Sequence, residues 1–84
     1  MERIKKMRKE KGFTQLQVQM KTGIDQSDYS KIERGIRYPT VEQLISLSEL
    51  FGTSVDYLLE LTDESKPYPR NTHSSNVVKK KKQL

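Results

Sequence analysis

The chain has 84 residues, of which 32% are hydrophobic and none is cysteine, so it has room for one small domain and excludes disulfides and thiolate metal sites. No cluster of His, Cys or carboxylate side chains has catalytic or metal-binding spacing, so we expect no enzymatic activity, no metal and no cofactor. The net charge of +5 is unevenly placed, because residues 1–40 carry ten basic and five acidic side chains whereas residues 41–61 carry four acidic side chains and no basic one.

The first predicted helix spans residues 2–11, with Ile4 and Met7 turned inward, and it stops at Gly12. Charged residues alternate with isolated apolar ones along this segment. It therefore contains neither the apolar core of a signal peptide nor a membrane span, and we expect a cytoplasmic protein.

Capping residues mark the start of the second and third predicted helices. The second begins at Thr14, because Thr14 and Gln17 have the spacing of a capping box, and it stops at Gly23. The third follows Asp25, which is a good N-cap residue, and stops before Gly35. These signals predict two short helices separated by a tight turn.

The same logic predicts two more helices. Thr40 and Gln43 repeat the capping-box spacing and open a fourth helix that runs to Gly52, and a short fifth helix is predicted over residues 54–60. The apolar side chains of the fourth helix are Val41, Leu44, Ile45, Leu47 and Phe51. Those of the fifth helix, which we expect to be buried, are Val55, Leu58 and Leu59. No segment alternates apolar and polar residues as a strand does, so the predicted fold class is all-α with five helices.

The composition changes after Leu61. Residues 62–84 are polar, hold two of the three prolines and show no helical apolar stripe. We therefore expect one domain at residues 1–61 and a disordered basic tail at residues 62–84. Its KKKK run is either simply solvated or adds to the attraction of phosphate.

The second and third helices, joined by the turn Gly23-Ile24-Asp25, have the arrangement of a helix-turn-helix unit. In such a unit the second helix, here at about residues 26–34, enters the major groove of double-stranded DNA. Helical spacing turns Tyr29 and Ile32 inward. The opposite face carries amide, hydroxyl and basic side chains of the kinds that read base edges, namely Gln26, Ser27, Ser30, Lys31 and Arg34.

Four runs, RKEKGFTQ, GIDQSDYSKIERG, YPT and LFGTSVDYLL, add to this pattern. Together, over about residues 3–61, they resemble the Cro/C1-type (XRE) helix-turn-helix domain of phage repressors and bacterial regulators. The resemblance implies a five-helix domain, encoded by a bacterium or a phage, that binds palindromic operators in double-stranded DNA as a homodimer. It also implies that the regulator is most often a repressor.

The resemblance implies roles for individual residues. The residues it places at DNA are Thr14, Gln15, Gln26, Ser27, Ser30, Lys31, Arg34 and Arg37. Of these, Gln26, Ser27 and Lys31 would meet base edges, and Arg34 and Arg37 would meet the phosphate backbone. Gln15 would touch a phosphate and brace Gln26. A largely buried ion pair between Arg8 and Glu33 would tie the first helix to the third.

Three positions depart from the family pattern. Gln19 stands where the family usually has alanine at the contact between the second and third helices, and Thr22 replaces a common leucine. We therefore expect looser or shifted packing there. Asp28 places an acid near the groove edge, where it could accept a hydrogen bond from cytosine or cap the helix.

Other functions use the same domain. An antitoxin or a restriction-modification controller would bind DNA in the same way, whereas a protein-interaction module would not, and Leu16 and Met20 are a possible partner site on the second helix. The basic residues Lys31, Arg34 and Arg37 favour DNA. Since the acidic segment 41–61 should face away from phosphate, we expect dimerisation around the fifth helix.

Overall fold

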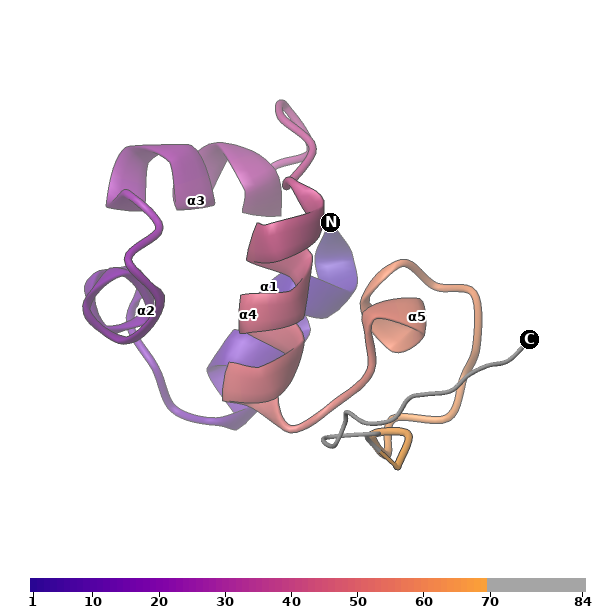
Figure 1. Ribbon diagram of the computed structural model, residues 1–84. Coiled ribbons are helices and arrows are strands. Elements are labelled where there is room, and N and C mark those ends of the chain that lie inside the picture. Colours follow the sequence, from indigo (N-terminus) through magenta and orange to yellow (C-terminus); the bar gives the residue numbers. More distant parts are fainter. Residues whose placement is uncertain (70–84) are drawn as a thin grey trace, which may run out of the picture.

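A computed structural model describes residues 1–69, and Figure 1 shows how their helices are arranged. The helices are α1 (Glu2–Glu10), α2 (Gln15–Thr22), α3 (Gln26–Glu33), α4 (Val41–Phe51) and α5 (Val55–Leu58). The described residues contain no strand. The prediction of an all-α, five-helix fold is confirmed.

Side-chain caps start α2, α3 and α4 where the sequence predicts them. Thr14 and Thr40 each form a complete capping box, the first with Gln17 and the second with Gln43. The Asp25 carboxylate accepts hydrogen bonds from the backbone N–H groups of the second and third residues of α3. Each cap satisfies backbone donors that a helix start leaves without an intrahelical partner.

The hydrophobic core lies between the helices, with α4 running through the middle of the domain (Figure 1). In this view α2 and α3 lie on one side of α4 and α5 on the other, and α1 lies behind it. The core contains Ile4, Met7, Val18, Ile24, Tyr29, Ile32, Leu47, Phe51, Tyr57 and Leu58. No described helix is long and apolar enough to cross a bilayer.

The fifth helix differs from its prediction. It ends at Leu58 because Glu60 takes a left-handed backbone conformation, with φ of 63°, and turns the chain back. Leu59 points outward and is 38% exposed, and Val55 is only half-buried, so of the three predicted burials only that of Leu58 is confirmed. Val41 and Ile45 of α4 are also exposed, at 69% and 39%. Apolar side chains are thus left exposed on α4 and directly after α5.

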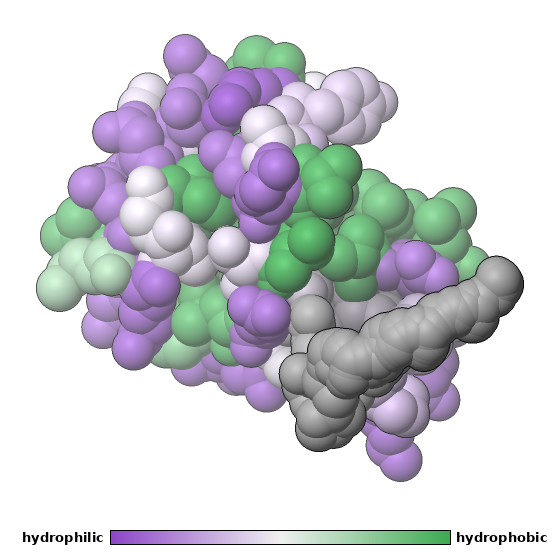
Figure 2. Space-filling view, viewed as in Figure 1, coloured by the Kyte–Doolittle hydropathy of each residue, from purple (hydrophilic) through white to green (hydrophobic). Residues whose placement is uncertain are grey.

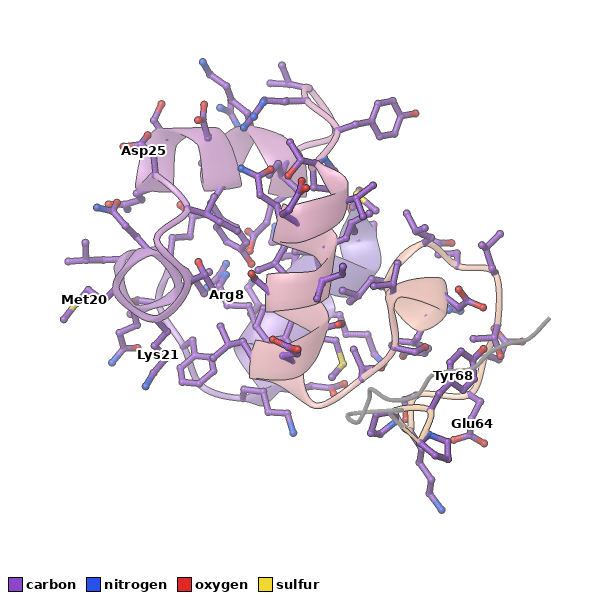
Figure 3. All side chains as sticks on the ribbon, in the orientation of Figure 1. Arg8, Met20, Lys21, Asp25, Glu64 and Tyr68 are labelled. Atoms are coloured by element: carbon purple, nitrogen blue, oxygen red, sulfur yellow. The ribbon has the colours of Figure 1, made fainter. Side chains whose placement is uncertain are left out.

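The structure describes the first eight residues of the predicted tail, residues 62–69. Residues 62–69 form a loop that returns to the helices: the Thr53 hydroxyl donates to the Ser65 carbonyl at 2.6 Å, and the Tyr68 hydroxyl donates to Asp56 at 3.0 Å. Arg3 binds the Thr62 carbonyl and pairs with Asp63 at 2.8 Å. Figure 3 shows Glu64 and Tyr68 on this loop beside α5. The rest of the predicted tail, residues 70–84, lies outside the described residues.

Candidate nucleic-acid interface

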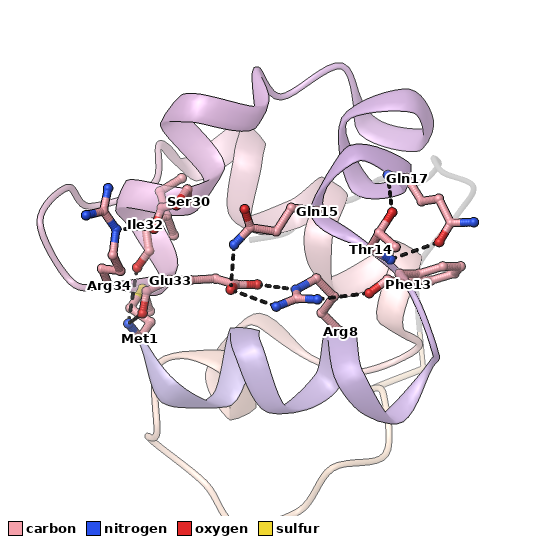
Figure 4. Close-up of polar contacts among 10 residues, drawn as sticks. All are labelled: Met1, Arg8, Phe13, Thr14, Gln15, Gln17, Ser30, Ile32, Glu33 and Arg34. Carbon is pink, nitrogen blue, oxygen red and sulfur yellow. Dashed lines mark hydrogen bonds and ion pairs between the residues drawn. The ribbon is translucent and has the colours of Figure 1, made fainter.

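An ion pair connects the first three helices (Figure 4). Arg8 donates from Nε to Glu33 Oε2 at 2.6 Å and from Nη2 to Glu33 Oε1 at 3.1 Å, so the guanidinium engages both carboxylate oxygens. Gln15 at the start of α2 donates to the same Oε1 at 3.1 Å. The side chains of Arg8 and Glu33 are only 12% and 3% exposed. The pair therefore anchors α1 and α2 to the C-terminal end of α3.

The carboxyl of Glu33 is held in its charged form. Burial alone raises the pKa of a carboxyl, but hydrogen bonding by Arg8 first, and then by the nearby Tyr29 and Gln15, outweighs burial and brings the pKa of Glu33 below its ordinary value. The Tyr29 side chain is fully buried beside this carboxylate. Burial and the adjacent Glu33 charge raise the pKa of Tyr29. The cluster is thus an ionised pair with a neutral phenol beside it.

The expected brace between Gln15 and Gln26 is absent from this arrangement. The start of α2 lies beside the end of α3, so the Gln15 amide reaches Glu33 at 3.1 Å. The backbone N–H of Gln26 instead donates to the side-chain oxygen of Gln19 at 2.7 Å. Gln19, for which the family pattern predicts looser or shifted packing, therefore supports the start of α3.

The outward face of α3 is polar, and Figure 2 shows hydrophilic side chains gathered over this helix. Gln26, Ser27, Lys31 and Arg34 are exposed and Ser30 is half-buried, whereas Tyr29 and Ile32 on the opposite face are fully buried. No ion pair in the described part of the chain engages Lys31. Amide, hydroxyl and ammonium groups are thus available together on a rigid helix whose other side is fixed in the core.

The remaining predicted DNA contacts flank this face. Arg37 follows α3 and pairs with Asp28 at 3.4 Å, so Asp28 neutralises part of its charge and does not cap the helix. Arg34 donates from Nε to the Ser30 carbonyl at 3.4 Å. The Thr14 oxygen accepts from the Gln17 backbone at 3.1 Å, which leaves its O–H free to donate.

A polar hollow of about 470 Å³ lies where α1, α2 and the end of α3 meet. Its walls include Gln15, Ser30 and Arg34, which the sequence had placed at DNA, and also Lys5 and Lys9 of α1. The two lysines were missed by sequence reasoning. Their spacing of four residues on the polar face of α1 was the signal for them, but only the fold brings that face beside Gln15 and Arg34.

Two short helices joined by a three-residue turn, with the second presenting a polar face over a buried apolar one, define a helix-turn-helix DNA-binding protein. A family model described as "Helix-turn-helix domain" matches residues 1–64. The chain belongs to this family, in the XRE (Cro/C1) type of helix-turn-helix domain, and the relatives that share the domain are transcriptional regulators.

Several bacterial regulators are similar in sequence. The uncharacterised HTH-type transcriptional regulator y4dJ of Sinorhizobium fredii is 42% identical over 60 residues, which is 71% of this chain and 78% of that protein. The HTH-type transcriptional regulator ImmR of Bacillus subtilis is 38% identical over 64 residues, or 76% of this chain and 50% of ImmR. SinR of Bacillus licheniformis is 37% identical over 65 residues, covering 76% of this chain and 59% of SinR.

The chain spans between half and three-fifths of most of these relatives, for example 59% of the uncharacterised regulator YobD of Bacillus subtilis. No solved structure shows a significant match.

Proposed function

We propose that this regulator is a repressor that binds a palindromic operator as a homodimer and reads base edges with the outward face of α3. The observation that carries the proposal is the contrast between the two faces of α3. Tyr29 and Ile32 fix one face in the core, and Gln26, Ser27 and Lys31 stand exposed on the other. Gln26 would present its amide to adenine and Lys31 would donate to guanine.

Basic and hydroxyl groups beside α3 would bind the phosphates of the DNA backbone. Lys5, Lys9 and Arg34 line one hollow at the end of α3, and Thr14 lies at the adjacent start of α2. Arg37 lies beyond α3, where its guanidinium can keep one nitrogen near Asp28 and offer the others to a phosphate oxygen. These groups lie around the outward face of α3. Contacts with phosphate from such positions fix the orientation of a helix in the groove.

The exposed apolar side chains on α4 and directly after α5 support a second copy of the chain as the partner. Val41, Ile45 and Leu59 are exposed there together with Leu61, which is 72% exposed. Figure 2 shows apolar side chains gathered over α4 and toward α5, away from the polar face of α3. Residues 41–61 carry four acidic side chains and no basic one. Like charges across a two-fold axis repel, so we expect the free dimer to be weak and to strengthen on DNA.

Selection of bound sequences from random DNA, followed by footprinting, tests this proposal. The expected result is two inverted half-sites about one helical turn apart. When the selected site overlaps a promoter, the protein should lower expression of a reporter, because a bound dimer blocks polymerase. A single unpaired half-site bound by monomer at full affinity would contradict the dimer, and increased reporter expression would contradict repression.

Deleting residues 70–84 should weaken DNA binding without changing the preferred sequence. Residues 1–69 carry eleven basic and eleven acidic side chains, so the net charge of +5 belongs entirely to the deleted segment. Each lost lysine–phosphate contact should lower the slope of log affinity against log salt by about one unit. Affinity measured at several salt concentrations for the two chain lengths checks this, and a changed sequence preference would show that residues 70–84 do more than attract phosphate.

A further inference from the structure

The turn between α2 and α3 is held by side chains that differ from the family pattern. Gln19 accepts hydrogen bonds at both ends of this turn. Its backbone carbonyl accepts from Gly23 N–H at 2.7 Å, and its side-chain oxygen accepts from Gln26 N–H at 2.7 Å. The Thr22 hydroxyl donates to the Val18 carbonyl at 2.7 Å and accepts from Ile24 N–H at 3.2 Å. Polar bonds thus fix a turn for which the sequence predicted loose or shifted packing.

These bonds complete the start of α3. A helix leaves its first N–H groups without intrahelical partners. Here the Asp25 carboxylate, labelled at the start of α3 in Figure 3, accepts from Ser27 at 3.0 Å and Asp28 at 3.3 Å, and Gln19 accepts from Gln26. Asp25 is local to the helix, whereas Gln19 belongs to α2. Among the hydrogen bonds of residues 1–69, the Gln19 bond is therefore the one that ties the first residue of α3 to another helix.

We propose that Gln19 is a positioning residue for base recognition, which sets the orientation of Gln26 at the DNA. The inference rests on the proposed reading role of Gln26. A bidentate contact from an amide to adenine requires both hydrogen bonds to be well aligned, so it is sensitive to small rotations of the backbone that carries the amide. Gln26 is the first residue of α3, where helices fray, and the Gln19 bond holds its backbone in one place.

The test combines Gln19→Met, which keeps the side-chain volume but removes the acceptor, with Gln26→Ala. We expect Gln19→Met to lower discrimination at the base pair read by Gln26 by about three- to tenfold, the loss expected for one hydrogen bond. Discrimination at the base pair read by Lys31 should not change. In the Gln26→Ala background Gln19→Met should cause no further loss of discrimination. Amide exchange at Gln26 in free protein should become faster in Gln19→Met.

Gln43 provides a matched control. Its side-chain oxygen also accepts a backbone N–H at a helix start, from Thr40 at 3.0 Å, but it lies at α4. Gln43→Met should remove a comparable cap and leave base discrimination unchanged. Gln19→Glu retains the acceptor oxygen and should keep discrimination, although its negative charge should lower affinity for all sequences alike.

The outcomes separate the two claims. If Gln26→Ala lowers discrimination at one base pair and Gln19→Met does not, the positioning role is overturned and the reading role stands. The positioning role is also overturned if Gln19→Met lowers discrimination equally at the base pair read by Gln26 and at the one read by Lys31, because equal losses indicate a general disturbance of α3. If Gln26→Ala itself leaves discrimination unchanged, the proposed reading role fails, and the inference fails with it.

Discussion

Replacing Glu33 with alanine is expected to destabilise the domain by about 3 to 5 kcal/mol, because it leaves the Arg8 guanidinium largely buried without its carboxylate. The Glu33 side chain is 3% exposed and holds Arg8 at 2.6 Å and Gln15 at 3.1 Å. A loss of this size is a large part of the stability of a small domain. Denaturant unfolding at pH 7 measures it. Where the variant proves unfolded, Arg8→Met, which removes the cation and keeps its apolar stem, reports the coupling instead.

Glu10→Ala is the matched control for this prediction. Glu10 pairs with Lys6 at 3.2 Å on the outer face of α1, where both side chains are about half exposed, so its removal should leave the unfolding midpoint nearly unchanged. Equal midpoints for Glu33→Ala and the unsubstituted chain would show that the pair does not hold the helices together.

Lowering the pH should reproduce part of the loss in unfolding free energy that Glu33→Ala causes. The folded-state pKa of Glu33 lies below its ordinary value of 4.5, so the stabilisation is fully present above about pH 4.5 and is lost as the pH falls through the folded-state value. Glu33→Gln cannot ionise and should remove this part of the pH dependence. Unfolding free energies of the two proteins between pH 7 and pH 3 should therefore converge toward the acid end.

The helices could be predicted because their signals are local. The capping boxes at Thr14 and Thr40 each involve residues three apart, and Gly23 takes a left-handed backbone with φ of 80° directly after α2. Such interactions depend on sequence neighbours and survive in any tertiary context. The bounds of α2 and α3 therefore followed from the sequence to within a residue.

Contacts between distant residues could not be predicted in this way. Arg3 reaches Asp63 across 60 positions, and the loop at residues 62–69 is held by such contacts although its composition is that of a tail. Gln15 and Gln19 are one turn apart on α2, and only the angle between α2 and α3 decides that Gln15 reaches Glu33 and Gln19 reaches Gln26. The sequence around Gln19 predicts looser packing because its hydrogen-bond partner, Gln26, lies in another helix.

Replacing Gln26 or Lys31 with alanine is expected to cost about 1 to 3 kcal/mol of binding free energy on the preferred operator and to relax discrimination at one base pair per half-site. Both side chains are exposed on the outward face of α3, and no ion pair in the described residues competes for Lys31. The measurement is binding of each variant to the preferred site and to its single-base variants.

Arg37→Ala is the contrasting change, because Arg37 lies outside α3 and would contact phosphate. It should weaken binding to all sequences alike and lower the salt slope by about one unit. Arg37 also pairs with Asp28 at 3.4 Å, so Arg37→Ala both removes a phosphate contact and leaves the Asp28 carboxylate unpaired near DNA. The double substitution with Asp28→Ala separates these two effects. The double variant should bind better than Arg37→Ala alone and still have the lower salt slope.

If Gln26→Ala and Lys31→Ala behaved as Arg37→Ala does, with equal losses on every sequence, α3 would bind DNA without recognising bases, and the base-recognition proposal would have to be abandoned.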